Sequence, residues 1–174
     1  MRTLVAAISL VGSCSAVHAQ FAQPSLSQDR KSLTYLRNGQ PLSAPAVVPE
    51  QEQFGEPAVS RDGRTIGWLA YTPNCCTSYP IPTALVILRD GRPPRYYSEA
   101  SPIWRWAFAN DGAAVAYAVH PTHGRFVVNY TLRRVSDGKP LAKCACDPDD
   151  PGQKTGKGAP AWVRAVAFGE CPIP

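Results

Sequence analysis

The stretch Pro57-Ala-Val-Ser-Arg-Asp-Gly-Arg-Thr-Ile-Gly-Trp-Leu69 decides the fold, because two other segments repeat its pattern. Residues 24–36 and residues 106–118 align with it without gaps. Each copy places an apolar residue three positions before an aspartate, an aliphatic residue four positions after it and an aromatic residue two further on. These positions hold Leu26, Asp29, Leu33 and Tyr35 in the first copy, Val59, Asp62, Ile66 and Trp68 in the second, and Phe108, Asp111, Val115 and Tyr117 in the third.

This pattern predicts a β-hairpin in each copy. Asp-Gly supplies the left-handed backbone conformations that a tight turn needs. The aliphatic and the aromatic residue fall on one face of the second strand, because the side-chain period of a strand is two. Arg30 stands where the other copies have glycine, so we expect the first turn to be weaker or different.

A second turn is also repeated. Leu88-Arg-Asp-Gly-Arg-Pro-Pro94 matches Val135-Ser-Asp-Gly-Lys-Pro-Leu141, and Leu36-Arg-Asn-Gly-Gln-Pro-Leu42 matches both. Each proline lies just outside the central ladder, where a missing N–H is tolerated. The two motifs together predict a four-stranded unit over residues 57–98, another over 104–143, and a short copy over 24–42. Residues 162–168 are expected to form a last strand that completes the short copy.

The spacing of the units resembles that of a known repeat. Asp62 and Asp111 are 49 positions apart, and Asp90 and Asp137 are 47 apart, close to the length of a four-stranded propeller blade. The hairpin phrases at residues 59–68 and 108–117 resemble the WD40-like repeat of TolB-type β-propellers. This resemblance implies an all-β fold, a reduced or open propeller of about three blades built from antiparallel hairpins. A sandwich made of similar hairpins is the alternative.

Composition excludes several classes of protein. The 174 residues make one domain. The 18 scattered prolines argue against long helices, since proline costs about 3 kcal/mol inside a helix. The net charge of +5 is spread along the chain, which argues against a nucleic-acid footprint. No segment after the first nineteen residues is apolar enough to predict a membrane span.

Residues 1–19 are interpreted as a secretory signal peptide. Arg2 precedes a short apolar run at residues 4–11, and small residues precede Gln20. This interpretation leaves a single domain over residues 20–174 and places the protein in the periplasm. The alternative is a lipobox at residues 11–14, which would make Cys14 a lipid anchor.

Five cysteines remain after this segment, and export exposes them to an oxidising compartment. Disulfides that hold irregular loops are therefore expected. Because five is an odd number, one thiol should be free or paired with another chain. The disulfide candidates are Cys75, Cys76, Cys144, Cys146 and Cys171.

Blade topology predicts that one rim of the fold carries the binding site. Both Asp-Gly turns of a full unit fall on one rim, so the longer segments 72–83, 98–104, 120–126 and 144–160 fall on the other. Binding residues usually lie on such loops. The predicted partner-binding residues are Tyr79, Ser98, Ser101, Trp104, His120, His123 and Arg125.

Other chemistry has weaker support in the sequence. His120 and His123 could meet Cys144 and Cys146 around zinc or copper, but oxidation would compete for the thiols, and neither a metal nor another cofactor is expected. The acidic segment 147–150 does not match a calcium loop. No hydrolase, metalloprotease or phosphate-loop motif occurs, so no catalytic residue is assigned and the chain is not expected to be an enzyme.

The expected function is therefore non-enzymatic protein binding. Small size, export and loops on one face resemble the plan of periplasmic immunity proteins, which inhibit type VI secretion peptidoglycan amidases as toxin inhibitors. The resemblance implies that a loop, either 98–104 or 120–126, enters the active site of a secreted cell-wall hydrolase. The alternatives are an envelope scaffold subunit of TolB-like type and a cell-wall carbohydrate binder using Trp104 with Tyr96 or Tyr97. The oligomeric state stays open.

Overall fold

Three antiparallel sheets make up the protein in the computed structural model, which describes residues 20–123, 127–147, 149–150 and 159–167. Each sheet is a meander of consecutive strands, and none of the three is closed. The strands are β1 (Phe21–Leu26), β2 (Leu33–Arg37), β3 (Gln40–Ser43), β4 (Gln53–Val59), β5 (Thr65–Thr72), β6 (Ile81–Arg89), β7 (Arg95–Ser98), β8 (Ile103–Ala109), β9 (Ala114–Val119), β10 (Val128–Arg134) and β11 (Pro140–Cys146).

The sheets correspond to the units that the repeats predict. The first sheet is β1-β2-β3, the second β4-β5-β6-β7 and the third β8-β9-β10-β11. The all-β class and the two four-stranded units are therefore confirmed. Trp106 is buried, as expected for a core position, and of the neighbouring tyrosines Tyr97 is buried while Tyr96 is exposed.

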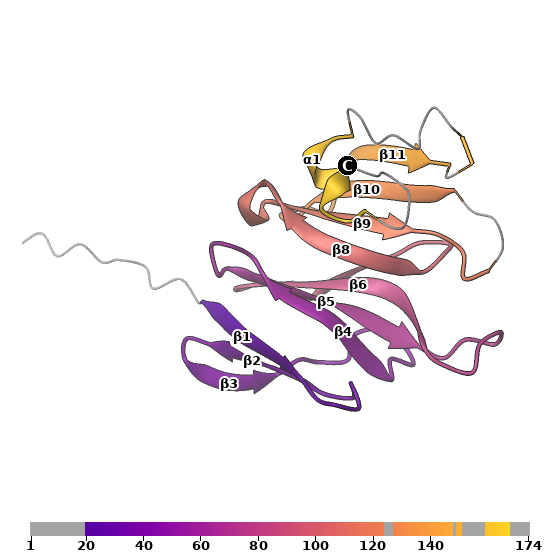
Figure 1. Cartoon of the computed structure of the whole chain (residues 1–174). Coiled ribbons are helices and arrows are strands. Elements are labelled where there is room, and N and C mark those ends of the chain that lie inside the picture. Colours follow the sequence, from indigo (N-terminus) through magenta and orange to yellow (C-terminus); the bar gives the residue numbers. More distant parts are fainter. Residues whose placement is uncertain (1–19, 124–126, 148, 151–158, 168–174) are drawn as a thin grey trace, which may run out of the picture.

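The sheets lie in layers, from β1–β3 at the bottom of Figure 1 to β8–β11 at the top. One apolar cluster joins the first and second sheets around Trp68, and another joins the second and third around Tyr117. A third cluster, centred on Tyr130, covers the outer face of the third sheet. Every internal gap between sheets is thus filled by apolar side chains.

The turns after β1 and β4 have the same hydrogen bonds. In the second turn the Ser60 hydroxyl donates to the Asp62 carboxylate over 2.7 Å and accepts from the Thr65 N–H over 3.0 Å. In the first turn the Ser27 hydroxyl donates to the Asp29 carboxylate over 2.7 Å and accepts from the Ser32 N–H over 3.0 Å. Each aspartate also accepts the N–H two positions on, so serine and aspartate together fix the turn.

Arg30 does not change the geometry of the first turn, so the expectation of a different turn was wrong. Its φ of 61° lies close to the 68° of Gly63, so arginine adopts the left-handed conformation that glycine adopts in the second copy. The Arg30 side chain makes contacts that a glycine at this position could not make. Its guanidinium lies 4.5 Å from the centre of the Tyr71 ring, and its Nε donates to the Phe54 carbonyl over 3.1 Å.

The third Asp-Gly turn differs from the other two. Ala109 replaces the serine, and residues Asn110–Gly112 form a short 3-10 turn closed by the Ala113 N–H on the Asn110 carbonyl. Three consecutive residues there have positive φ. A Cβ on Gly112 would lie 2.7 Å from the Ser60 Cβ, so this glycine lets the second and third sheets approach at their turns.

The first two hairpins contact each other reciprocally. The Phe21 N–H donates to the Gly63 carbonyl over 2.6 Å, and the Phe54 N–H donates to the Arg30 carbonyl over 2.8 Å. Phe21 and Arg30 are 33 positions before Phe54 and Gly63, respectively. Each hairpin therefore pairs the start of its first strand with the turn of the other, as in a local two-fold arrangement.

The core between these hairpins has the same symmetry. The rings of Phe21 and Tyr35 are 5.5 Å apart, and those of Phe54 and Trp68 are 6.3 Å apart. All four side chains are buried, and so are Leu33 and Ile66 between them. Equivalent residues of the two copies thus pack into one shared core.

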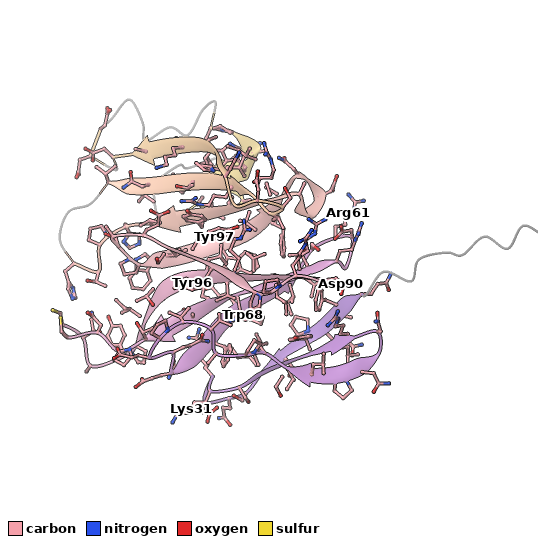
Figure 2. All side chains as sticks on the ribbon, turned by 180° about the vertical axis from the view of Figure 1, so that it is seen from behind. Lys31, Arg61, Trp68, Asp90, Tyr96 and Tyr97 are labelled. Carbon is pink, nitrogen blue, oxygen red and sulfur yellow. The ribbon has the colours of Figure 1, made fainter. Side chains whose placement is uncertain are left out.

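The two-fold arrangement makes β1 run opposite to β4. Lys31 and Arg61, from the two matching turns, accordingly lie towards opposite ends of the molecule in Figure 2. The strands β1, β2 and β3 therefore follow the directions of β5, β6 and β7. This places the β2–β3 turn beside the β6–β7 turn, where Arg37 forms an ion pair with Asp90.

The segment expected as a last strand is a helix instead. Residues Ala161–Arg164 form α1, which packs on the outer face of the third sheet and does not complete the first. Val163 and Val166 are buried there, and a spacing of three puts two side chains on one helical face. The described part of the chain contains no helix long and apolar enough to cross a membrane.

Replacing Ser60 with alanine should destabilise the protein more than the same change at Ser27. Ser60 is buried, and its loss leaves the Thr65 N–H without its side-chain partner, which costs about 1–3 kcal/mol. Ser27 is partly exposed, so water can replace its hydroxyl. Urea unfolding of both variants measures the difference. Equal losses of unfolding free energy in the two variants would contradict the argument that the buried Ser60 hydroxyl contributes more than the partly exposed Ser27 hydroxyl.

Acid should weaken the second turn. The hydrogen bond from the Ser60 hydroxyl lowers the pKa of Asp62 below its ordinary 3.8. Folding stability from this carboxylate is therefore present above that value and is lost as pH falls through the lower folded pKa. Asp62→Asn should reduce the urea midpoint at pH 7 and lower its dependence on pH between 4 and 2. An unchanged pH profile would contradict this role.

Candidate functional site

Consecutive antiparallel strands place alternate connections at opposite ends of each sheet. In the second and third sheets one end carries the short turns 60–64, 90–94, 110–113 and 135–139, which we call the turn rim. The other end carries the connections 73–80, 99–102 and 120–127, which we call the loop rim. Arg61 and Asp111 join two of the turns through a 3.0 Å ion pair. The predicted partner-binding residues that the structure describes belong to the loop rim or its immediate strand ends.

Trp104 and His120 form the base of the loop rim. Their rings stack 5.2 Å apart with planes 14° from parallel. The Trp104 indole N–H donates to the His120 carbonyl over 2.9 Å. Together these contacts tie the start of the third sheet to the end of β9, where the connection 120–127 begins.

His120 supports this connection and does not present its ring at the surface. Its side chain is 5% exposed, and Nδ1 lies 2.7 Å from the Pro121 carbonyl oxygen. Burial lowers its pKa below the ordinary 6.5, because the charged imidazolium is poorly solvated there. At neutral pH the ring is therefore uncharged.

The remaining predicted residues have different degrees of exposure. Tyr79 is 55% exposed, and its carbonyl accepts a 2.6 Å hydrogen bond from the Thr77 hydroxyl. Ser98 and His123 are exposed, and Ser101 is half-buried. Arg125 lies outside the described residues. The loop rim also exposes Val127, which the sequence analysis did not single out.

A cleft of about 360 Å³ lies beside Ser101. Glu99, Lys143 and Cys144 contribute to its walls. The described lining holds no histidine that could activate the serine or the cysteine, whereas nucleophilic catalysis needs a base within hydrogen-bond reach. The cleft thus offers polar contacts, and Glu99 and Lys143 supply its charged groups.

Glu99 is held by a network inside the fold. The Tyr117 hydroxyl donates to its carboxylate over 2.5 Å, and Arg133 contacts both the carboxylate and the tyrosine oxygen. Burial, with the bonded Glu99 carboxylate adding to it, raises the pKa of Tyr117 to about 12. The network anchors the start of the 99–102 segment, which includes Ser101, to the centre of the third sheet.

One of the described cysteines is disulfide-bonded, as expected, and the other three are not. Cys146 takes part in a disulfide, whereas Cys75, Cys76 and Cys144 are free. Cys75 and Cys76 are exposed neighbours with sulfur atoms 2.8 Å apart. Cys171, the possible anchor Cys14 and the predicted signal peptide lie outside the described residues.

The described residues do not bring together the ligands that a zinc or copper site needs. Among the residues that the structure describes, no three histidine, cysteine, aspartate or glutamate side chains are placed to share an ion. His120 is buried against Trp104, while His123 is exposed. The two histidines are therefore not presented as a pair.

Sequence reasoning missed a groove on the turn rim. It measures about 510 Å³ and lies between the β6–β7 turn and the β10–β11 turn. Arg89, Arg92 and Arg95 line it. The sequence does carry a signal, because arginine stands at every third position of Arg89-Asp-Gly-Arg-Pro-Pro-Arg95. The turn motif alone does not predict that these arginines line one groove.

Comparisons with known proteins give little further information. No protein family model and no curated protein matches the chain. Among solved structures it is similar to a puromycin-hydrolyzing peptidase of Mycobacterium tuberculosis, at 18% identity and a TM-score of 0.46. That similarity covers 70% of this chain but 21% of the peptidase, so the chain spans about a fifth of that protein.

Replacing Trp104 with alanine should release the loop rim. Amide exchange at residues 119, 120 and 122 should speed up by about tenfold, equivalent to about 1.4 kcal/mol of local stability. The pKa of His120 should rise toward its ordinary value, because removing the indole admits water. Trp104→Phe keeps a stacking ring and serves as the control. NMR titration and hydrogen exchange measure both effects, and an unchanged His120 pKa in the alanine variant would contradict the packing argument.

Proposed function

We propose that the chain is an exported, non-enzymatic protein-binding module of the periplasm that engages its partner through the loop rim. The observation that carries this proposal is the stacked and hydrogen-bonded Trp104–His120 pair. It gives the described start of the 120–127 connection, residues 120–123, a fixed base, and a pre-ordered segment loses less entropy on binding than a free one. Exposed Tyr79 and Val127 supply apolar contact area on the same rim.

The more specific proposal is an immunity protein for a secreted peptidoglycan amidase. Segments 98–104 and 120–126 are the inserting loops in this proposal. Ser101 favours this proposal, because its hydroxyl lies on the segment anchored through Glu99 and can hydrogen-bond a polar group in the cleft of an enzyme. The described lining of the cleft beside Ser101 includes no histidine. The part of 120–126 that includes Arg125 lies outside the described residues.

We further propose that the second and third sheets are successive blades of an open propeller. Both have four strands in the same order, and their equivalent turns are joined at one rim by Arg61 and Asp111. In this arrangement the first sheet supplies the last three strands of a preceding blade, because β1–β3 follow the directions of β5–β7. Among the described residues this preceding blade has no first strand.

Tyr79→Ala should weaken the complex with the partner by at least about tenfold, because an exposed aromatic at a binding face is a frequent energetic anchor. The protein is first isolated with its partner from envelope extracts of its host, and the complex is identified by native mass spectrometry. Affinity is then measured by calorimetry, together with hydrolase activity with and without the protein.

Tyr96→Ala is the matched control. Tyr96 is 47% exposed but belongs to β7 next to the turn rim, so its loss should leave the affinity unchanged. A stoichiometric complex in which the amidase is inactive supports the immunity proposal. Binding to bare peptidoglycan without a protein partner, or equal losses for both tyrosine variants, would contradict it and favour a wall-binding or scaffold role.

A further inference from the structure

The groove on the turn rim has a chemistry that the loop-rim proposal does not use. Its walls come from two copies of the same sequence motif, the turn after β6 and the turn after β10. Arg89, Arg92, Arg95 and Tyr96 come from the first copy, and Val135 and Ser136 from the second. Its volume of about 510 Å³ falls within the usual range of small-molecule sites.

The three arginines of the groove have no carboxylate partner within the described part of the chain. The acidic residues of the same two turns are already engaged: Asp90 pairs with Arg37, and Asp137 pairs with Arg134. No acidic side chain is part of the described lining of the groove. No acidic side chain of the described lining therefore neutralises the positive charge of the arginines.

The local sequence explains why these side chains gather. Pro93 and Pro94 fix their own φ near the polyproline value, and a polyproline segment has three residues per turn. Arg92 and Arg95, one on each side of the prolines, therefore project to the same side. In the turn after β10, Gly138 leaves space for Arg95, since a Cβ there would lie 2.6 Å from an Arg95 guanidinium nitrogen.

Pro93 and Pro94 add an apolar surface to the charged groove, with Ile87 and Val135 beside it. Tyr96 faces the other side of β7, because side chains alternate along a strand and Arg95 pairs with Ile87. Guanidinium groups bind carboxylate and phosphate through paired hydrogen bonds. We propose that this groove binds a small ligand that carries a phosphate or carboxylate group on a flat, apolar body, with the oxyanion on Arg92 and Arg95 and the body against Pro93 and Pro94.

The test uses phenyl phosphate, benzoate and inorganic phosphate as probes of the purified protein. Chemical shifts and calorimetry should show saturable binding of phenyl phosphate, tighter than inorganic phosphate by at least about fivefold. Binding should weaken with added salt, because the contact is electrostatic. A preference for phenyl phosphate over benzoate assigns the site to phosphate ligands, and the reverse preference assigns it to carboxylates.

Variants distinguish binding in this groove from non-specific attraction of an anion to a basic protein. Arg92→Ala should weaken phenyl phosphate at least about tenfold. Arg61→Ala, an exposed arginine of the same rim that is already paired with Asp111, should leave binding unchanged. Tyr96→Ala should leave both affinities unchanged, because the Tyr96 side chain faces the other side of β7.

Two results would overturn the proposal. One is the absence of saturable binding of all three probes by the folded protein. The other is an equal loss in Arg92→Ala and Arg61→Ala, which would show attraction to the net charge alone. Arg92 is exposed in a turn, so its replacement should leave the thermal unfolding of the protein unchanged, and circular dichroism checks this.

Discussion

The reciprocal contact between the first two hairpins is the constraint on which the rest of the structure depends. Two main-chain hydrogen bonds, from Phe21 to Gly63 and from Phe54 to Arg30, fix the hairpins against each other. Between them lie paired copies of one aromatic and aliphatic set, around Trp68. Burial of such side chains is the main favourable term in folding. Once the first sheet is seated, the second sheet has one face covered and can bury its other face against the third.

The strand connectivity gives the second and third sheets two different ends. Short turns gather at the turn rim, and longer connections gather at the loop rim. The loop rim is supported from below by the Trp104–His120 stack and by the network around Glu99 and Tyr117. The turn rim instead carries the groove lined by Arg89, Arg92 and Arg95. We propose that the supported loop surface binds a protein and that the charged groove binds a small anion.

The hairpins, their turns and most core positions could be predicted from the sequence, because they follow from local turn chemistry and a strand period of two. The reversal of the first hairpin could not, since a repeat in sequence says nothing about the direction in which two copies pack. Arg30 was misjudged for a related reason: its contacts with Tyr71 and Phe54 come from another sheet. The helix at Ala161–Arg164 replaced a predicted strand because Val163 and Val166 pack on the third sheet. The roles of His120 as a support and of the arginine groove depend on contacts between elements far apart in the chain.

Amide hydrogen exchange at Phe21 and Phe54 tests the central contact most directly. An isolated hairpin is marginally stable, so its amides exchange fast, whereas a reciprocal pair must be protected together. The structure predicts that both amides exchange slowly and at similar rates, and that both become fast when Trp68 is replaced by alanine. A fast Phe21 amide beside a slow Phe54 amide in the unaltered protein would contradict the two-fold seating of the first sheet.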